Sequence, residues 1–549
     1  MPHGVVVLLL VLLLAFSAAG APAFPAVLGR LSAYGRGGAR LVAAGLRGGE
    51  GLAAAVETLG PLYIKVGQSL VSRPDLIGHQ TARLLRPLLE RVTPAFDGAE
   101  VCAVLKAAGF DRQVNLSSVT VAPVAAASLG QVHRAELLDG TPVALKVLRP
   151  GLAEIIATDL FLLRLAASAI QPLLKTNVLA AVDEIGVRLL EETNLVNEAK
   201  NLALFRSLYD FESGGTHSRS MPRPGVGTPA LYANLCNDRI VTMGWIDGTS
   251  LVEHDTMPKK QLLEITTLGL RCSLSQLLDT GVLHADPHFG NLVVDQQTGR
   301  LVYLDFGLLA RVPKRVRLAL LCAVVHLVER DYSALAGEFE DLLLLSAEEL
   351  RDNREALEAA LEKAVADIFV FGVNEGEEEK AADVLQRLPR LKFDQIVATL
   401  LRLASRFNLL SPPYFANNVR AISSLDGMAL SADPKFNLFR VVYPFMVSRL
   451  FAELDEPKIA ALFRKLVLCP KSGLVRWAKV KLLLREACAP GSGCTPLSLL
   501  RGLLATRGGR SFLRQTAASY VAQARARLAR MLLRSGWRVR SGTQRPRTA

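Results

Sequence analysis

Two carboxylates and one carboxamide lie within about twenty residues of this 549-residue chain, at a spacing suited to phosphoryl transfer. Asp286 and Asn291 belong to the segment His284-Ala-Asp-Pro-His-Phe-Gly-Asn291, and Asp305 begins the tripeptide Asp305-Phe-Gly307. A transferring phosphoryl group spreads negative charge over its oxygens, so the protein must hold a divalent metal beside it. Asn291 and Asp305 carry oxygens that bind Mg²⁺, and Asp286 is the candidate catalytic carboxylate that orients the acceptor hydroxyl.

The separation of Asp286 and Asn291 is that of the Asp and Asn in the catalytic loop of protein kinases, whose D-F-G motif binds Mg²⁺. A lone D-F-G recurs by chance, but the two motifs together are far more specific. Apolar runs flank both motifs and predict short β-segments, at 281–283, 291–294 and 301–304.

An upstream lysine and glutamate are candidates for holding ATP. Lys146 ends Val143-Ala-Leu-Lys146, which predicts a strand with an inward lysine that contacts the α- and β-phosphates and a helix glutamate. Glu198 is the best partner, on a helix predicted from Val182 to Phe205. The 52 residues between Lys146 and Glu198 exceed the usual kinase separation, so we expect an inserted helical segment. A solvated lysine on an edge strand is the alternative for Lys146.

The loop before that strand should cover the phosphates. It contains Ala125, Ala126, Ala127 and Ser128, where kinases have glycine. A Cβ atom disfavours the positive φ that glycine allows, so we expect an altered nucleotide pose or preference. Taken alone, an alanine run is also typical of a helix or of ordinary core packing.

Lys65 and Gln68 form an unusual polar pair in the apolar segment 59–69. Their spacing puts them on one face of a predicted helix. We regard both as candidate cofactor-binding residues, with a solvated helix face as the alternative.

Together these segments resemble the UbiB family of atypical kinases, also called ADCK or ABC-one kinases, over roughly residues 51–330. The helical stretch 411–437 is similar to the plastid and cyanobacterial branch. The segments that carry the resemblance are KVGQ (65–68), AAAS (125–128), QVH (131–133), VALK (143–146), HADPHFGN (284–291) and DFG (305–307).

The resemblance implies an α+β, protein-kinase-like two-lobe fold with an N-terminal KxGQ helical extension and a long helical C-terminal extension. It implies that Lys65 and Gln68 fold over the active site, where a peptide substrate would otherwise lie. ATP and Mg²⁺ are the expected cofactors. The family is associated with ATP binding and hydrolysis and with isoprenoid-quinone and prenyl-lipid metabolism of the plastoquinone, tocopherol and ubiquinone type. Plastid members are tied to thylakoids and plastoglobules, so prenyl-lipid biosynthesis enzymes are expected partners.

Two positions depart from the family pattern. The family's Glu-x-Asp pair is Glu192-Thr-Asn194 here, which keeps an oxygen but loses a charge. The family's second proline in HADPHPGN is Phe289, which alters loop stiffness more than chemistry because Asp286 and Asn291 are retained.

The first fifty residues resemble targeting segments. Val5 to Ala19 form an apolar run of signal-peptide length, and residues 21–49 contain four Arg and no acid before Glu50. We expect a bipartite presequence that directs the protein to a plastid, with thylakoid or plastoglobule association. A membrane anchor followed by a flexible linker is one alternative, and a protein of the mitochondrial inner membrane is another.

The overall composition, 50% hydrophobic and 21% charged, predicts a folded body of several units, and seven scattered cysteines without C-x-x-C favour a reducing compartment. The expected units are 1–22 (signal-peptide-like), 23–50 (transit-like segment or linker), 51–115 (KxGQ helical extension), 116–250 (N-lobe with helical insertion), 251–330 (C-lobe catalytic region), 331–500 (helical region) and 501–549 (basic amphipathic tail).

The tail from Arg501 carries twelve Arg, no Lys and no acid, so it supplies +12 of the net +13. A nearly neutral body argues against nucleic acid as a partner. Apolar residues at helical spacing predict one stripe flanked by Arg, which favours peripheral attachment to a prenyl-lipid membrane or lipid droplet. The alternative is a helix that packs on the core and ends in a disordered basic segment. The stripe comprises Leu513, Ala517, Tyr520, Ala524, Leu528 and Met531.

Three functions remain open from the sequence. The first is an ATP-using kinase or ATPase of the UbiB class, in which Lys146 and Glu198 hold the phosphates. The second is a nucleotide-gated lipid-binding or scaffold protein with little phosphoryl transfer. The third, a conventional protein kinase, is disfavoured by KVGQ and by the lack of a recognisable A-P-E after D-F-G.

Overall fold

The computed structural model divides the chain into two compact units. The first comprises Met1–Ala203, Pro229–Ile246 and Asp305–Gly307, and the second comprises Leu204–Thr228, Asp247–Leu304 and Leu308–Ala549. Within the residues described, no helix has the length and apolar character needed to cross a bilayer. The described residues are 24–46, 49–71, 77–90, 92–173, 178–210, 226–285, 289–370, 390–391, 402–403, 406–407, 409–410, 413–469, 474–489 and 494–534.

An antiparallel sheet forms the centre of the first unit, with strand order β1-β3-β4-β5 and β2 paired to β3. Alternate residues of β4 are buried on one face, against helix α8 (Gly98–Ala107). Because side chains alternate along a strand, Lys146 lies on the opposite face. The chain turns between β3 and β4 at Gly140, whose φ is +85°. The strands are β1 (Val114–Asn115), β2 (Ala125–Ala126), β3 (Gly130–Leu137), β4 (Pro142–Leu148) and β5 (Ile240–Gly244).

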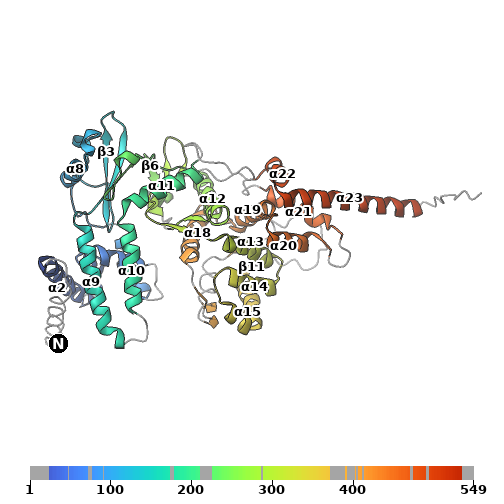
Figure 1. Cartoon of the computed structure of the whole chain (residues 1–549), viewed down its shortest axis with the longest axis horizontal. Coiled ribbons are helices and arrows are strands. Elements are labelled where there is room, and N and C mark those ends of the chain that lie inside the picture. The colour runs from blue at the N-terminus through green and yellow to red at the C-terminus, as the bar shows by residue number, and fades with distance from the viewer. Residues whose placement is uncertain are drawn as a thin grey trace, which may run out of the picture. The chain divides into compact units, whose positions relative to one another are not determined.

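Helices form the rest of the first unit, and two of them account for the long separation between Lys146 and Glu198. Helices α9 and α10 are inserted after β4 and contact each other along their length (Figure 1). The expected inserted helical segment is therefore confirmed. The helices are α2 (Phe24–Leu46), α3 (Leu52–Glu57), α4 (Pro61–Val71), α6 (His79–Leu85), α7 (Pro87–Glu90), α9 (Leu152–Ile170), α10 (Val178–Glu192) and α11 (Leu195–Tyr209), whose last residues belong to the second unit.

Two expectations from the sequence are corrected in this unit. The continuous helix predicted from Val182 to Phe205 is wrong, because α10 ends at Glu192 and α11 begins at Leu195. Between them the Asn194 side-chain oxygen accepts the Val196 N–H at 3.1 Å, which favours a new helix start. In the segment 23–50, residues Phe24–Leu46 form helix α2, which packs on α3 and α9, so the linker alternative is wrong there and the transit-like assignment stays a prediction. The signal-peptide-like residues 1–22 lie outside the described residues.

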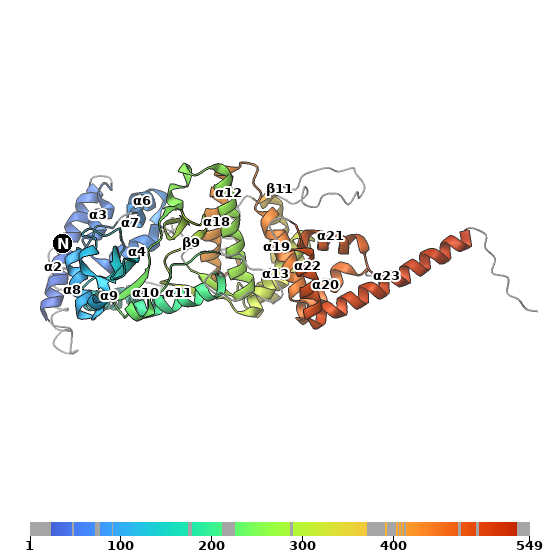
Figure 2. The ribbon, with the colours of Figure 1, turned by 90° about the horizontal axis from the view of Figure 1, so that it is seen from above.

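The second unit begins with small sheets and continues as helices, as predicted for the chain beyond Pro313. Strands β6 (Gly248–Ser250), β8 (Leu292–Asp295) and β9 (Leu301–Tyr303) form one sheet, and β7 (Val282–His284) pairs with β10 (Leu309–Arg311). The three predicted β-segments around the motifs are thus confirmed. In Figure 2, α12 and α18 lie side by side. The helices are α12 (Lys259–Ser275), α13 (Lys314–Val328), α14 (Tyr332–Asp341), α15 (Ala347–Ile368), α18 (Pro413–Ala432), α19 (Phe439–Ala452), α20 (Pro457–Val467), α21 (Trp477–Ala487), α22 (Pro496–Ala505) and α23 (Arg507–Arg534).

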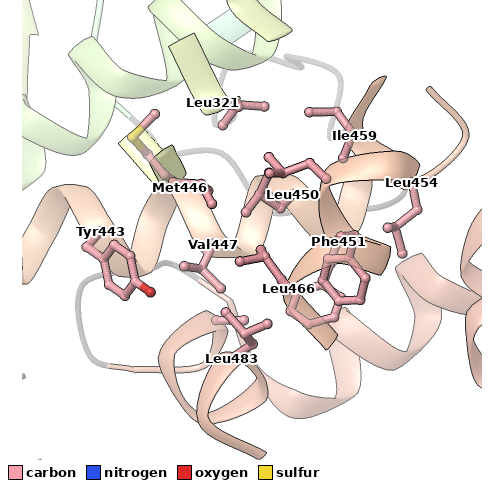
Figure 3. Packing of buried hydrophobic residues seen from close by; sticks show 14 of the residues in the cluster. Leu321, Tyr443, Met446, Val447, Leu450, Phe451, Leu454, Ile459, Leu466 and Leu483 are labelled. Atoms are coloured by element: carbon pink, nitrogen blue, oxygen red, sulfur yellow. The ribbon is translucent and has the colours of Figure 1, made fainter. Parts of the chain in front are cut away.

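Helix α19 lies at the centre of the largest apolar cluster of the second unit. It is buried on nearly every side despite containing Pro444. Figure 3 shows its side chains meeting residues of α13, α20 and α21. The labelled contacts include Met446, Leu450 and Phe451 of α19, Leu321 of α13, Ile459 and Leu466 of α20, and Leu483 of α21.

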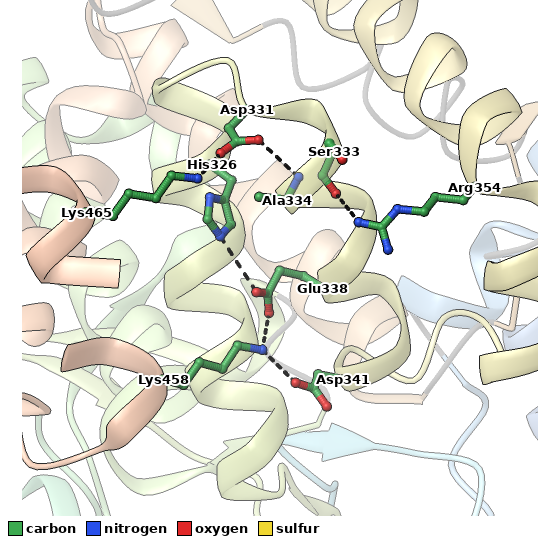
Figure 4. A network of polar contacts seen from close by, with 9 residues as sticks. All are labelled: His326, Asp331, Ser333, Ala334, Glu338, Asp341, Arg354, Lys458 and Lys465. Atoms are coloured by element: carbon green, nitrogen blue, oxygen red, sulfur yellow. Dashed lines mark hydrogen bonds and ion pairs between the residues drawn. The ribbon is translucent and has the colours of Figure 1, made fainter. Parts of the chain in front are cut away.

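A buried polar network joins α13, α14 and α20 in the same unit (Figure 4). The Lys458 ammonium lies 2.6 Å from both Glu338 and Asp341, and His326 lies 3.7 Å from Glu338. Burial raises the pKa of Glu338, and the hydrogen bond from Lys458 opposes this rise. Burial also lowers the pKa of His326. The network therefore depends on Lys458 to keep an ionised carboxylate stable between three helices.

The basic tail helix α23 has two different halves. Its first half packs on the body, where the Phe512 ring lies 5.0 Å from that of Phe463 and Tyr520 meets Trp477 edge-on. Beyond Val521 the described side chains are exposed except for the partly exposed Gln523. The predicted apolar stripe is therefore not uniform. Leu513 is half-buried and Tyr520, although 62% exposed, contacts Trp477, whereas the other stripe residues face solvent: Ala517, Ala524, Leu528 and Met531.

Replacing Lys458 by Met should lower the free energy of unfolding by about 2 kcal/mol at pH 8, because Glu338 loses its cation. The loss should shrink toward pH 5. Without Lys458, the pKa of buried Glu338 in the folded protein would rise further above its value in the unfolded chain. Below the unfolded pKa the carboxyl is protonated in both states and costs nothing, whereas at higher pH the folded state must hold an unpaired carboxylate and loses stability. Urea denaturation at several pH values measures this.

Lys465→Met is the matched control on the same helix. Lys465 also lies 2.6 Å from a carboxylate, Asp331, but its side chain is 66% exposed. We expect a change below about 1 kcal/mol. Equal losses for the two variants would contradict the role given to Lys458.

Candidate functional site

Lys146 lies between two carboxylates of the first unit. Its ammonium nitrogen is 2.6 Å from Glu198 Oε1 and 3.1 Å from Asp305 Oδ1. The side chain of Glu198 is 4% exposed, that of Lys146 18% and that of Asp305 42%. Strand β4, helix α11 and the D-F-G segment, which are far apart in sequence, thus meet at one charged cluster.

The charges of this cluster support each other. Burial alone would lower the pKa of Lys146, but the negative charges of Asp305 and Glu198 outweigh burial and hold that pKa above its usual value. Burial raises the pKa of Glu198, and Lys146 opposes the rise. Lys146 therefore stays a cation within the cluster.

Hydrogen bonds from neighbouring residues hold the D-F-G segment. The Gly307 N–H donates to Asp305 Oδ1 at 3.0 Å, and the Asn201 amide donates to the Phe306 carbonyl at 3.0 Å. The Phe306 side chain is fully buried. Asn201 was not among the residues selected from the sequence, although it lies three positions after Glu198 and therefore on the same helix face.

The alanine-rich loop forms a tight turn beside β3. Ala125 and Ala126 make strand β2, and the Ala127 N–H donates to the Gly130 carbonyl at 2.8 Å. None of the three alanines has a positive φ. Ser128 is buried. The loop thus has a conformation that Cβ atoms allow, and the altered nucleotide pose expected from the absence of glycine stays a prediction.

The QVH segment has a structural role that the sequence did not predict. Buried Gln131 donates to the Phe96 carbonyl at 2.7 Å and accepts from the N–H groups of Ala95 and Phe96. The ring of His133 is 2.9 Å from the Thr120 carbonyl. These side chains attach two connecting segments to strand β3.

Lys65 and Gln68 both have partners within the first unit. Both residues lie on helix α4, and the predicted helix is thus present. The Lys65 ammonium is 2.5 Å from Glu192 Oε2, and the Gln68 amide donates to the Leu88 carbonyl at 2.8 Å. Lys65 therefore contacts the first residue of the Glu192-Thr-Asn194 segment, whereas exposed Asn194 uses its oxygen to cap α11.

The catalytic-loop residues belong to the second unit. Asp286 falls within 286–288 and lies outside the described residues. Asn291 precedes β8, and its carbonyl accepts the Leu304 N–H at 3.0 Å. Leu304 immediately precedes Asp305 in the sequence, so the β8–β9 hairpin brings the chain back to the start of the D-F-G segment.

A family model described as the ABC1 atypical kinase-like domain matches residues 88–338. The curated relatives include Protein ACTIVITY OF BC1 COMPLEX KINASE 3, chloroplastic, of Arabidopsis thaliana. It is 33% identical over 440 residues, which are 78% of this chain and 56% of the relative. The uncharacterized protein slr1919 of Synechocystis is 30% identical over 439 residues, 78% of this chain and 71% of that protein. The chain thus spans a little over half the length of the Arabidopsis thaliana relative, and also of Protein ACTIVITY OF BC1 COMPLEX KINASE 1, chloroplastic, from the same organism.

Among solved structures, the complex of Rv3197 with erythromycin from Mycobacterium tuberculosis is similar to this chain. The identity is 24%, the match covers 65% of this chain and 90% of that one, and the TM-score is 0.39. The family match, which ends at residue 338, confirms the predicted α+β, kinase-like fold, and helices α15–α23 form a long C-terminal extension beyond it.

Replacing Lys146 by Met should cost about 3 kcal/mol of folding stability, because it leaves the Glu198 carboxylate buried without its cation. Adding Glu198→Gln should recover part of the loss, giving a coupling of about 1–3 kcal/mol in a double-mutant cycle. Lys200→Met, an exposed position on the same helix, is the control and should change stability by less than about 0.5 kcal/mol. Additive losses, measured by chemical denaturation, would contradict the coupling.

Proposed function

We propose, because the chain belongs to the ABC1 atypical kinase-like family in its plastid and cyanobacterial branch, that it is an atypical kinase or ATPase that binds Mg-ATP. Its proposed role is to support or regulate isoprenoid-quinone and prenyl-lipid metabolism. The observation that carries the proposal is the position of Lys146, 2.6 Å from Glu198 and 3.1 Å from Asp305.

The residues of the first unit fit a bound nucleotide. The Lys146 ammonium is the donor for the α- and β-phosphates, and Glu198 fixes its position. The tight turn of Ala125, Ala126 and Ala127, with Ser128 buried beneath it, is the proposed cover over the phosphates.

Asp305, only partly buried, offers carboxylate oxygens of the kind that Mg²⁺ prefers, and Asn291 is proposed as a second ligand. When bound, Mg²⁺ would neutralise charge on the phosphate oxygens. Asp286 is proposed to accept the proton of the acceptor hydroxyl or water. Lys65 and Gln68, on the helix attached to Glu192, are proposed to restrict access to the same pocket.

A plastid location is supported by two kinds of relative: those whose names include chloroplastic, and those from a cyanobacterium. We propose attachment to thylakoid or plastoglobule surfaces through the distal half of α23. Helix geometry puts its exposed apolar residues on one face, and Arg residues flank that face on both sides. The apolar residues are Tyr520 (62% exposed), Val521 (47%), Leu528 (57%) and Met531 (65%), and the flanking residues are Arg525 and Arg527.

Asp305→Asn should reduce ATP turnover at least 100-fold, because the site loses the charge that holds the metal. Turnover is measured with and without vesicles that contain prenyl lipid. Asp255→Asn, at a side chain 89% exposed, should leave turnover unchanged. Turnover that survives Asp305→Asn would reject the metal role. Nucleotide binding without turnover in the unmodified protein would favour the nucleotide-gated scaffold instead.

Replacing Arg525, Arg527 and Arg530 together by Gln should weaken binding to vesicles containing anionic lipid at least tenfold, because each Arg near the surface contributes about 1 kcal/mol. The control replaces three exposed Arg of other elements, Arg112, Arg239 and Arg440. Flotation at low and high salt measures binding. Equal flotation of both triple variants would reject attachment through α23.

A further inference from the structure

Helix α2 is attached to the first unit by a buried ion pair. The Arg30 guanidinium binds Asp159 of α9 through two hydrogen bonds, Nε to Oδ1 and Nη2 to Oδ2, each 2.6 Å long. The Tyr34 hydroxyl donates to Asp159 Oδ1 at 2.7 Å. The Asp159 side chain is fully buried and that of Arg30 is 15% exposed. Among the described residues, both hydrogen-bonding partners of the Asp159 carboxylate are on α2.

The same arginine also holds the start of the next helices. Arg30 Nη2 donates to the Leu59 carbonyl, one residue before Gly60. Gly60 has a φ of +108°, and a Cβ atom there would lie 2.8 Å from the Arg30 guanidinium. The ring of Tyr34 meets that of Tyr63 on α4 edge-on, with centroids 5.4 Å apart. Arg30 and Tyr34 therefore fix the first turn of α4.

Helix α4 leads from these contacts toward the charged cluster. Two residues after Tyr63, Lys65 pairs with Glu192 at the end of α10. The chain turns there and begins α11, which carries Glu198. Within this one unit, Arg30 therefore contacts the start of α4, and α4 contacts the α10–α11 junction through Lys65. Helix α11, which begins at that junction, carries Glu198.

We propose that Arg30, Tyr34 and Asp159 form a clasp that makes α2 a permanent part of the catalytic unit and positions the helix that carries Lys65 and Gln68. Residues 24–46 have transit-like composition, yet their removal would leave the Asp159 carboxylate buried without a cation, which is costly. Targeting cleavage, where it occurs, should therefore end before Phe24. Arg30 and Asp159 act as positioning residues, since neither belongs to the Lys146 cluster.

The first test uses hydrogen exchange on the full chain. Arg30→Met should speed amide exchange in residues 61–71 at least tenfold while leaving strands β3–β5 unchanged. It should also lower Tm by roughly 5–10 °C. Adding Asp159→Leu should restore much of the Tm, because no uncompensated charge then remains. Arg36→Met is the control. Arg36 lies on the same helix, is exposed and donates a hydrogen bond to exposed Ser32, so its replacement should change neither quantity.

Unchanged exchange in 61–71 for Arg30→Met, or an effect equal to that of Arg36→Met, would overturn the clasp. A loss of protection spread evenly over the first unit would also overturn it, because a positioning role predicts a local effect. Arg30→Lys should keep part of the protection, since an ammonium retains the charge but not the two-pronged geometry.

The second test determines the amino terminus of the mature protein by intact mass after isolation from the cells that make it. A terminus at or before Phe24 supports the proposal, and one beyond Arg30, which removes the cation that binds Asp159, overturns it. The effect on catalysis rests on the proposed function: Arg30→Met should raise the KM for Mg-ATP several-fold with little change in kcat. Absence of any ATP turnover would reject the proposed function. The hydrogen-exchange and mass measurements would still test whether Arg30, Tyr34 and Asp159 hold α2 in place.

Discussion

The burial of a lysine between two carboxylates is the constraint on which the first unit depends. Lys146 contacts both Glu198 and Asp305, and each comes from a different part of the chain. A buried charge without a partner is strongly destabilising, so strand β4, helix α11 and the D-F-G segment must meet for any of them to be stable. Helices α9 and α10 are inserted in the sequence between β4 and α11. The contacts of Lys146 therefore form only when these separate segments of the first unit come together.

Much of this site could be predicted from local patterns. The likeness of Val143-Ala-Leu-Lys146 to a kinase strand predicted an inward lysine, and its pairing with Glu198 is present although the helix around Glu198 begins at Leu195. The β-segments beside the two acidic motifs came from apolar runs with clear ends. Such runs are sufficient there because β8 and β9 are short and buried along nearly their whole length.

Other features could not be predicted because each depends on individual side-chain contacts, one of them local and the others long-range. The break at Asn194 arises from one side chain that caps α11, within a stretch whose composition favours helix throughout. In the sequence, Arg30 is one of four Arg in an acid-poor segment and contributes only to its transit-like composition. Its ion pair with Asp159, 129 positions later, has no local sequence signal. The stripe of α23 was predicted as one face, but Phe512 and Tyr520 pack against rings of α20 and α21 that periodicity cannot reveal.

Helix α19 has a consequence for the order in which the second unit forms. Pro444 lacks a backbone donor and costs an interior helix about 3 kcal/mol, so α19 has little tendency to form alone. Its stability comes from α13, which precedes it, and from α20 and α21, which are synthesised after it. During translation the apolar side chains of α19 therefore stay uncovered until residues up to about Ala487 have left the ribosome. Nascent chains that end before that point are expected clients for chaperones, and truncations before about Ala487 should aggregate rather than fold as shorter proteins.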